Sequence, residues 1–372
     1  MNKLTLKSKK LTAEALIRKI NTLHTPGEEI RLMEVCGTHT VAIFREGLRQ
    51  LLPKGIELVS GPGCPVCVTD QAYMDMALSY AAQDDVIIAT FGDMLKIPGT
   101  HSSLSQAQAE GAHIHIIYSP LEVIELGKQH KDKKIIMLAI GFETTIAAIG
   151  ATVQAVDASG LTNVFFLVSH KLVPPALRAL LDSQRGHIDG FILPGHVSVI
   201  IGEEPYQFLP TEYHIPSCVA GFDGCEILSA IVDILEQRQS KKYYVGNTYK
   251  SVVMKTGNPV AQEMMRTVYE VCDDVWRGIG MIPKSGLRLT KAYEHLDAQV
   301  ALPLTVTEPT VPIKGCRCGD VLQGLIKPNE CPLFGHACVP EHAVGACMVS
   351  VEGSCAAWYK YGYASGGLSW EE

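Results

Sequence analysis

Short, nearly continuous apolar runs alternate with stretches of helical periodicity along most of the chain. Each run has the length of a strand and ends near a glycine, a proline or a polar residue. Runs that are apolar at successive positions are typical of parallel sheets, whose strands are buried on both faces. The predicted strands are residues 30–35, 56–60, 86–90, 114–118, 134–140, 164–169, 188–193 and 217–220.

Apolar residues with a helical period fill the intervals between these strands. A further helix is predicted at residues 11–24, and another at residues 259–274. Strands that alternate with helices predict an α/β fold in which helices cover mainly parallel sheets. The intervening helices are predicted at residues 40–52, 69–82, 120–129, 144–155, 175–181 and 225–237.

A weak internal repeat divides this pattern. Residues 33–44 and 138–149 share an apolar strand, a glycine-containing turn and an apolar helix, and residues 90–99 and 193–202 also resemble each other. The repeat predicts two related α/β domains, 28–127 and 128–238, rather than one large sheet. The remaining residues, 1–27 and 239–372, are predicted to form a smaller helical and loop-rich domain.

Composition and charge exclude several classes of protein. The 372 residues are 47% hydrophobic and 19% charged, an ordinary globular balance, and the formal net charge of −7 gives no basic surface for nucleic acid. No apolar run is long enough to span a membrane, and no secretory signal precedes the first helix. The sequence therefore predicts a cytoplasmic protein without nucleic-acid or membrane partners.

The twelve cysteines gain weight in a reducing compartment, where structural disulfides are uncommon. Three of them, Cys36, Cys64 and Cys67, lie in the first predicted domain, and six fall between residues 316 and 355. This distribution predicts two separate sulfur sites. The remaining three are interpreted as buried thiols: Cys218, Cys225 and Cys272.

Four C-terminal cysteines are separated by loops rich in proline and glycine, which would let their thiolates converge on a metal. Their spacing favours a [4Fe–4S] cluster over zinc, because paired CxxC ribbons are absent. In the zinc alternative His336 is a substitute ligand. Cys316 and Cys347 are either small buried residues or an accessory dithiol beside the cluster. The four predicted ligands are Cys318, Cys331, Cys338 and Cys355.

The stretch GPGCPVC, residues 61–67, leaves three interpretations open. A C-x-x-C pair is found in redox dithiols, in halves of metal sites and in structural turns. Cys36 follows another predicted strand, with His39 three residues later, so this pair is either a nucleophile with its base or a soft-metal ligand with a supporting histidine. If the two strands are neighbours, all three thiols emerge at one sheet edge.

Four further polar residues follow predicted strands closely. Ligands of open α/β sheets bind beyond the carboxyl ends of the strands, so Asp93, Glu143 and His196 are candidates for a cleft. Glu143 is alternatively a cap for the helix that follows it. His170 is interpreted as a loop histidine rather than a ligand.

Together these motifs resemble the HypD family, maturation factors of [NiFe]-hydrogenases. The similarity covers nearly the whole chain beyond its first ~25 residues, and its ordered motifs are specific in combination. They are EVCGTHT (34–40), GPGCPVC (61–67), TFGDM with PG (90–99), GFETT (141–145), PGHVS (194–198), VAGF (219–222) and the cysteine spacing 318/331/338/355.

The resemblance implies a scaffold for metal assembly rather than a simple turnover enzyme. It implies a C-terminal iron–sulfur domain whose [4Fe–4S] cluster is held by the four cysteines named above. It also implies that iron is held at Cys36, Cys64 and Cys67 while its Fe(CN)2CO group is built, with a HypC-type chaperone and with HypE as the cyanide donor. His39, Asp93, Glu143 and His196 match motif positions of the family.

Two alternatives belong to other functional classes. One is a dithiol–disulfide oxidoreductase that draws electrons from the cluster through Cys64 and Cys67. The other is a zinc-stabilised binding module without electron chemistry.

Overall fold

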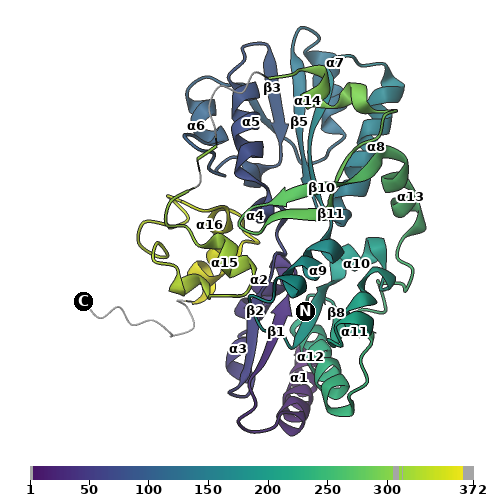
Figure 1. The fold of residues 1–372 in the computed structure, drawn as a ribbon, viewed down its shortest axis with the longest axis vertical. Helices are drawn as coiled ribbons and strands as arrows, with labels where there is room; N and C mark the ends of the chain where they lie inside the picture. The colour runs from purple at the N-terminus through teal and green to yellow at the C-terminus, as the bar shows by residue number, and fades with distance from the viewer. Residues whose placement is uncertain (1–2, 305–309, 312, 363–372) are drawn as a thin grey trace.

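Two β-sheets organise the molecule, one above the other in Figure 1. The structure is a computed structural model and describes residues 3–304, 310–311 and 313–362. The first sheet is parallel throughout, and its strands are paired in the order β2-β1-β7-β8-β9. These strands are β1 (Ile30–Glu34), β2 (Ile56–Ser60), β7 (Gly190–Pro194), β8 (Ser217–Ala220) and β9 (Val245–Asn247).

The second sheet has the order β10-β11-β6-β5-β3-β4. Four neighbouring strands of this sheet are parallel, namely β6, β5, β3 and β4. Strands β10 and β11 form an antiparallel hairpin, which joins the sheet where β11 pairs with β6. The strands are β3 (Val86–Thr90), β4 (Ile114–Ile116), β5 (Lys134–Gly141), β6 (Val164–Lys171), β10 (Tyr269–Trp276) and β11 (Gly280–Leu289).

The predicted α/β class with mainly parallel sheets is confirmed. The sheets do not coincide with the ranges 28–127 and 128–238, however, because each range supplies strands to both sheets. The chain builds β1 and β2, crosses to the second sheet for β3 to β6, and then returns to the first. Hydrophobic periodicity identifies strands but does not say which strands become neighbours.

The internal repeat nevertheless appears in the topology. The repeated segments relate β1 to β5 and β7 to β3, and the next strands along the chain relate β2 to β6 and β8 to β4. If each strand in the order β2-β1-β7-β8 is replaced by its counterpart, the result is β6-β5-β3-β4, which is the order observed in the second sheet. The two sheets are therefore related units whose strands are interleaved along the chain.

Helices cover both faces of the second sheet, as its apolar strands require. Alternate residues of β5 serve alternate faces: Ile135 and Met137 pack with α7 (Glu122–Gln129) and α8 (Glu143–Ser159). Ile136 and Leu138 pack with α5 (Gln71–Ala81) on the other side. This two-sided burial explains why the strand is apolar at every position.

The first sheet is covered in the same way. On one face lie α1 (Lys3–Leu23), α2 (Gly37–Arg45), α3 (Leu48–Leu51) and α12 (Gly224–Ser240). On the other lie α9 (Val173–Ser183), α10 (Gly195–Ile201) and α11 (Phe208–Glu212). The remaining helices of the upper half are α6 (Leu104–Ala109), α13 (Pro259–Val268) and α14 (Ala298–Ala301).

The predicted helix 259–274 is wrong at its C-terminal end. Helix α13 ends at Val268, and the chain continues as β10, which pairs with β11 and is joined through it to β6. Strands β9, β10 and β11 were not predicted, because they alternate weakly and depend on tertiary pairing. At the end of β10, Trp276 is fully buried and stacks on Phe142, with ring centroids 5.9 Å apart.

The C-terminal segment 313–362 consists of turns and short helices, namely α15 (Cys318–Leu322), α16 (Ala346–Val349) and α17 (Ser354–Ala357). It lies beside the junction of the two sheets (Figure 1). Its cysteines and Met348 share one hydrophobic core with Val35, Val59 and Cys67. A separate C-terminal domain is therefore not confirmed, since the segment packs into the core at the sheet junction.

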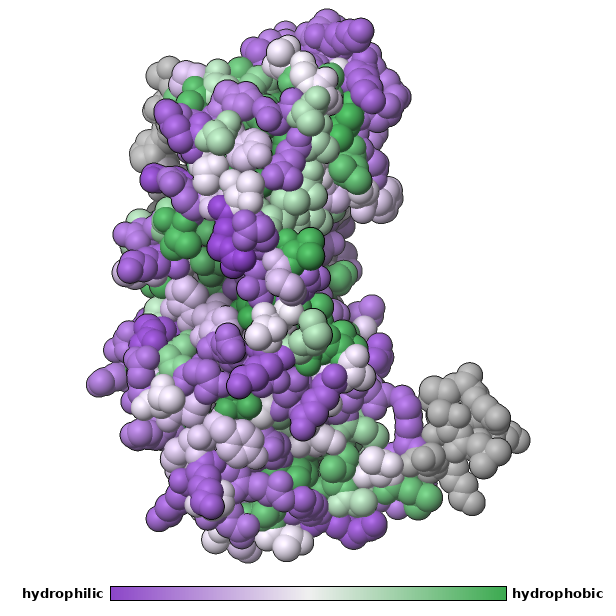
Figure 2. Space-filling view, turned by 90° about the vertical axis from the view of Figure 1, so that its right-hand side faces the viewer, coloured by the Kyte–Doolittle hydropathy of each residue, from purple (hydrophilic) through white to green (hydrophobic). Residues whose placement is uncertain are grey.

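Apolar and polar residues are interspersed on the face seen in Figure 2. Within the described part of the chain, no helix combines the length and apolarity needed to cross a membrane.

Candidate thiol and metal site

Cys36, Cys64 and Cys67 are brought together at one edge of the first sheet. Strands β1 and β2 are parallel neighbours, and their last residues, Glu34 and Ser60, are paired. Cys36 immediately precedes α2, and its neighbour Gly37 donates its backbone N–H to the carbonyl of Gly63 at 3.1 Å. Because the two strands are adjacent, all three cysteines emerge at the same sheet edge.

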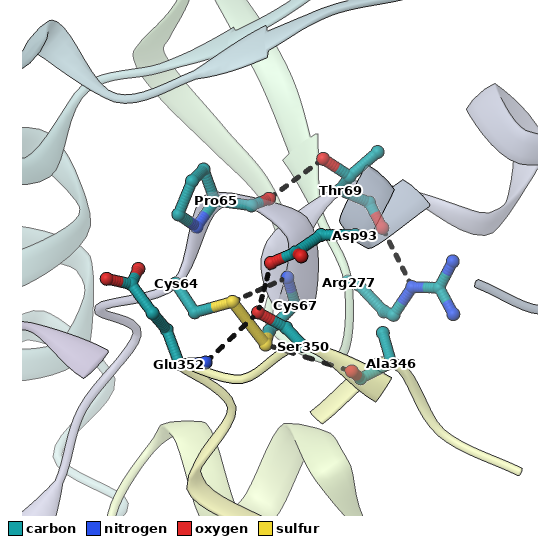
Figure 3. Close-up of a disulfide and its surroundings, with 9 residues drawn as sticks. All are labelled: Cys64, Pro65, Cys67, Thr69, Asp93, Arg277, Ala346, Ser350 and Glu352. Carbon is teal, nitrogen blue, oxygen red and sulfur yellow. Dashed lines mark hydrogen bonds between the residues drawn. A yellow bond between two sulfur atoms is a disulfide. The ribbon is translucent and has the colours of Figure 1, made fainter. Parts of the chain in front are cut away.

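Cys64 and Cys67 form a disulfide, with Cα atoms 5.2 Å apart (Figure 3). The bridge closes one helical turn, α4 (Pro65–Val68), in which proline occupies the first position. The Cys67 backbone N–H lies 3.2 Å from the Cys64 sulfur, and the Thr69 hydroxyl donates to the Pro65 carbonyl at 2.8 Å. The turn thus presents both sulfurs from a short, well-bonded segment.

Cys36 is buried and remains a free thiol. Burial raises its pKa to about 12, and the carboxylate of Glu352 acts in the same direction. The thiol is therefore protonated at neutral pH unless a cation stabilises its thiolate. A bound metal ion does this directly, because coordination removes the proton from a thiol.

Two histidine rings pack against Phe222, and one of them, His39, follows Cys36 by three residues. The His39 and His196 ring centroids lie 4.8 Å and 4.0 Å from that of Phe222. His39 Nε2 lies 2.9 Å from the Gly221 carbonyl, so it carries the proton, while Nδ1 is buried without a partner among the described residues. Burial lowers the pKa of His39 to about 4 and also lowers that of His196, so both rings are neutral at pH 7.

Glu143 begins α8 on the second sheet, but it does not cap that helix. Its Oε1 accepts the backbone N–H of Val173 at 3.0 Å, at the start of α9, while its Oε2 is buried without a partner in the described structure. Burial raises the pKa of the carboxyl to about 7. Glu143 therefore keeps its proton up to about pH 7, whereas an exposed glutamate loses it near pH 4.5.

This shift predicts a pH dependence of stability. The unfolded carboxyl loses its proton near pH 4.5, whereas the folded one keeps it up to about pH 7. The contribution is complete below pH 4.5 and is lost between pH 4.5 and 7, with a slope of at most about 1.4 kcal/mol per pH unit. We expect chemical denaturation to show a shallower loss of unfolding free energy for Glu143→Gln between pH 5 and 7.

The control is Glu110→Gln, which changes an exposed carboxyl and should keep the wild-type slope. Glu34, buried with a pKa of about 7, leaves a residual slope in both variants. Equal slopes for wild type and Glu143→Gln would contradict the prediction.

Asp93 reaches the site from the second sheet, just after β3. The Ser350 hydroxyl donates to its Oδ2 at 3.3 Å, and the Glu352 backbone N–H donates to the same hydroxyl at 3.3 Å (Figure 3). The Thr38 hydroxyl, beside Cys36, donates to Glu352 Oε1 at 2.7 Å. The C-terminal segment therefore links the edges of both sheets around the disulfide.

The interpretation of His170 as a loop residue is wrong. It lies inside β6, is fully buried, and packs edge-on against Tyr269 with ring centroids 4.8 Å apart. Strand β6 extends past its apolar run because β11 pairs with Lys171 and His170. The residue belongs to the core of the second sheet.

The six C-terminal cysteines all contribute to the core at the sheet junction. The sulfurs of Cys316 and Cys318 lie 3.2 Å apart, and Cys338 Sγ accepts the Val344 N–H at 3.3 Å. The pKa of the Cys318 thiol is raised by its hydrogen bond with Cys316, and its other thiol neighbours are Cys347 and Cys355. Cys316, Cys318, Cys347 and Cys355 therefore form one contiguous group, which contains two of the four predicted ligands.

Gly345 makes room for these sulfurs. A Cβ at this position would lie 2.5 Å from Cys318 Sγ and 2.6 Å from Cys316 Sγ, closer than real Cβ contacts. No three or more histidine, cysteine or acidic side chains within the described residues are already arranged as a site for a metal ion. The donor set is nonetheless rich in thiols, the ligand type of iron–sulfur clusters.

The sequence predicted two separate sulfur sites, but in the structure the two groups of cysteines are neighbours. Cys67 Sγ lies 3.9 Å from the carbonyl of Ala346, the residue before Cys347. Cys64, Cys67 and the C-terminal cysteines belong to one hydrophobic cluster. The two groups are far apart in the sequence, so their proximity in space could not be predicted from it.

Two nearby residues were not identified from the sequence, Ser350 and Glu352. They belong to no polar pattern of their own, and the only available signal was their position a few residues before Cys355. They reach the site because the C-terminal segment folds back over α2 and α4.

The fold and the site define an α/β protein of two interleaved parallel sheets, with a CPVC disulfide and a buried third cysteine beside a group of further thiols. A family model named HypD, described as "Hydrogenase formation hypA family", matches residues 11–362. The chain therefore belongs to the HypD family, as its motifs indicated, and its functional class is hydrogenase maturation.

Individual relatives agree over most of their length. The chain is 42% identical over 342 residues to "Hydrogenase maturation factor HypD" of Escherichia coli (strain K12), covering 91% of each chain. It is 40% identical over 344 residues to the protein of the same name from Rhodobacter capsulatus, again over 91% of each. It is 38% identical over 360 residues to "Hydrogenase expression/formation protein HupD" of Azotobacter chroococcum mcd 1, over 94% of each.

Proposed function

We propose that this protein is the scaffold on which iron, as substrate, receives the ligands of the Fe(CN)2CO group of [NiFe]-hydrogenase. The observation that carries the proposal is the meeting of Cys36 with the Cys64–Cys67 turn at the sheet junction. Three sulfurs can anchor a soft metal while leaving coordination positions for incoming ligands. Cyanide and CO are strong-field ligands suited to those positions.

The side chains around Cys36 have distinct roles in this proposal. His39 donates its Nε2 proton to the Gly221 carbonyl, so its free Nδ1 can only accept a hydrogen bond. His196 is exposed and neutral, and it is the ring that can donate to a bound cyanide. Glu143 keeps a proton in the buried site, and Asp93 holds the C-terminal segment in place through Ser350.

We assign the [4Fe–4S] cluster to Cys318, Cys331, Cys338 and Cys355. The assignment is supported by their burial or half-burial in one core and by the space that Gly345 leaves beside the Cys318 sulfur. When bound, such a cluster supplies or accepts single electrons. Cys316 and Cys347 are neighbours of Cys318 and suit the role of an accessory dithiol.

Cys64 and Cys67 alternate between two states in this scheme. Two single electrons, which would be delivered in turn through the proposed cluster, and two protons from solvent convert the disulfide into two thiols, of which either can then ligate iron as thiolate. The position of the disulfide against the C-terminal thiols supports this cycle. The partners are a HypC-type chaperone and HypE as the cyanide donor, and the compartment is the reducing cytoplasm.

The disulfide beside further thiols also favours a second candidate, a free-standing dithiol–disulfide oxidoreductase. That activity would reduce insulin disulfides without a chaperone. The scaffold proposal predicts no such turnover.

The test is anaerobic purification after co-expression with a HypC-type chaperone and HypE. We expect about four iron and four sulfide per chain from the cluster, additional substrate iron, and infrared bands of bound cyanide and CO. A colourless protein that contains zinc without iron would instead support a binding module. Iron and sulfide without bound diatomic ligands would contradict the scaffold role.

A further inference from the structure

The tip of the β10–β11 hairpin carries an arginine between the two sulfur groups. The Arg277 backbone N–H donates to the Val68 carbonyl at 2.8 Å. Its Nε donates to the Thr69 carbonyl at 2.7 Å, as Figure 3 shows. Both carbonyls belong to the end of the turn that contains Cys67. Arg277 therefore fixes that turn by one backbone and one side-chain bond.

The same hairpin tip also contacts the C-terminal thiol segment. A Cβ on Gly278 would lie 2.3 Å from the Cα of Gly319, the residue after Cys318, so the two backbones touch. Gln323 donates its Nε2–H to the Gly278 carbonyl at 2.9 Å. The position of Arg277 is thus set from both sides.

One end of the guanidinium has no partner. Arg277 Nη2 is buried and makes no hydrogen bond within the described residues. The guanidinium is near enough to Cys318, Cys347 and Cys316, and to Asp70, to be stabilised by their negative charge when they are ionised. Burying a cationic N–H without an acceptor is costly, so such a group indicates an anion beside it when the protein is fully assembled.

We propose that Arg277 is a positioning residue that joins the two sulfur groups by donating its Nη2–H to a sulfur of the C-terminal thiolate-bound cluster. The inference rests on the proposed function, because the acceptor is a cluster thiolate or sulfide. A positive charge at this place stabilises the more negative, reduced state of the cluster. No motif of the family resemblance included this residue.

Potentiometric titration of the purified holoprotein, followed by electron paramagnetic resonance, tests the proposal. For Arg277→Gln we expect the reduction equilibrium to shift about tenfold toward the oxidised cluster, which is about 59 mV for one electron. For Arg277→Lys, which keeps the charge but loses the planar donor, a smaller shift in the same direction is expected. The lysine variant also provides a folded comparison if the glutamine variant does not retain its cluster.

The matched control is Arg317→Gln. Arg317 lies between Cys316 and Cys318 in sequence, but its side chain is 45% exposed and pairs with Asp320 at 2.9 Å. Its removal should leave the titration unchanged because solvent screens the charge. If both Arg277 variants keep the wild-type midpoint potential, the inference about Arg277 is wrong while the proposed function stands. The same holds if the Arg317→Gln control shifts by an equal amount. A wild-type protein without iron and sulfide would overturn the proposed function as well.

Discussion

Cys64→Ala is expected to abolish the infrared bands of iron-bound cyanide and CO in protein co-expressed with its partners. The variant loses one sulfur of the disulfide and leaves Cys67 without a partner, so neither the dithiol cycle nor the three-sulfur anchor can form. The visible absorbance of the cluster should persist, since the four proposed ligands are unchanged. Infrared and visible spectra of one anaerobic sample measure both effects.

Cys225→Ala is the matched control for this variant. It also removes a free, partly buried thiol, but one in α12, whose sulfur lies 3.6 Å from the Lys9 carbonyl. We expect wild-type spectra in both regions. Loss of the cluster absorbance together with the diatomic bands in Cys64→Ala would show that the two sulfur groups cannot assemble independently.

The sequence predicted the strands of the parallel sheets well because each is apolar along its whole length. Strand β5 shows the reason, since Ile135 and Ile136 face opposite helical layers and both must be apolar. The division of strands between sheets could not be predicted in the same way. That β1 lies beside β7 depends on packing between segments far apart in the chain.

The candidate site was predictable where it depends on a local rule. Cys36 and Cys64 follow parallel neighbouring strands, and strand ends on one sheet edge converge. Ser350, Glu352 and Arg277 follow no such rule, because they arrive from a loop segment and from a hairpin tip. Their side chains acquire meaning only from the groups that they meet in space.

The interleaved sheets explain how a site with two kinds of sulfur arises. Cys36, Cys64 and His196 lie at the ends of first-sheet strands, whereas Asp93 and Glu143 follow strands of the second sheet. Because the chain crosses between the sheets, both sheets contribute side chains to the same junction. The C-terminal segment then packs into the same junction and adds its thiols.

Gly63→Ala is expected to cause the same loss of bound diatomics as removal of a thiol, although every sulfur is retained. A Cβ on residue 63 would lie 2.4 Å from the Cys36 nitrogen and 2.6 Å from its Cα, so the two backbones must separate. Overpacking of this kind costs about 1–3 kcal/mol of stability and displaces Cys36 from the disulfide turn. Infrared spectra of the co-expressed protein, with circular dichroism to confirm folding, measure the outcome.

Gly92→Ala is the matched control, because its new Cβ would find its nearest neighbour at 3.8 Å, in the side chain of Ile116. Wild-type diatomic bands in a folded Gly63→Ala protein would mean that the close approach of Cys36 to the CPVC turn is not required for holding iron.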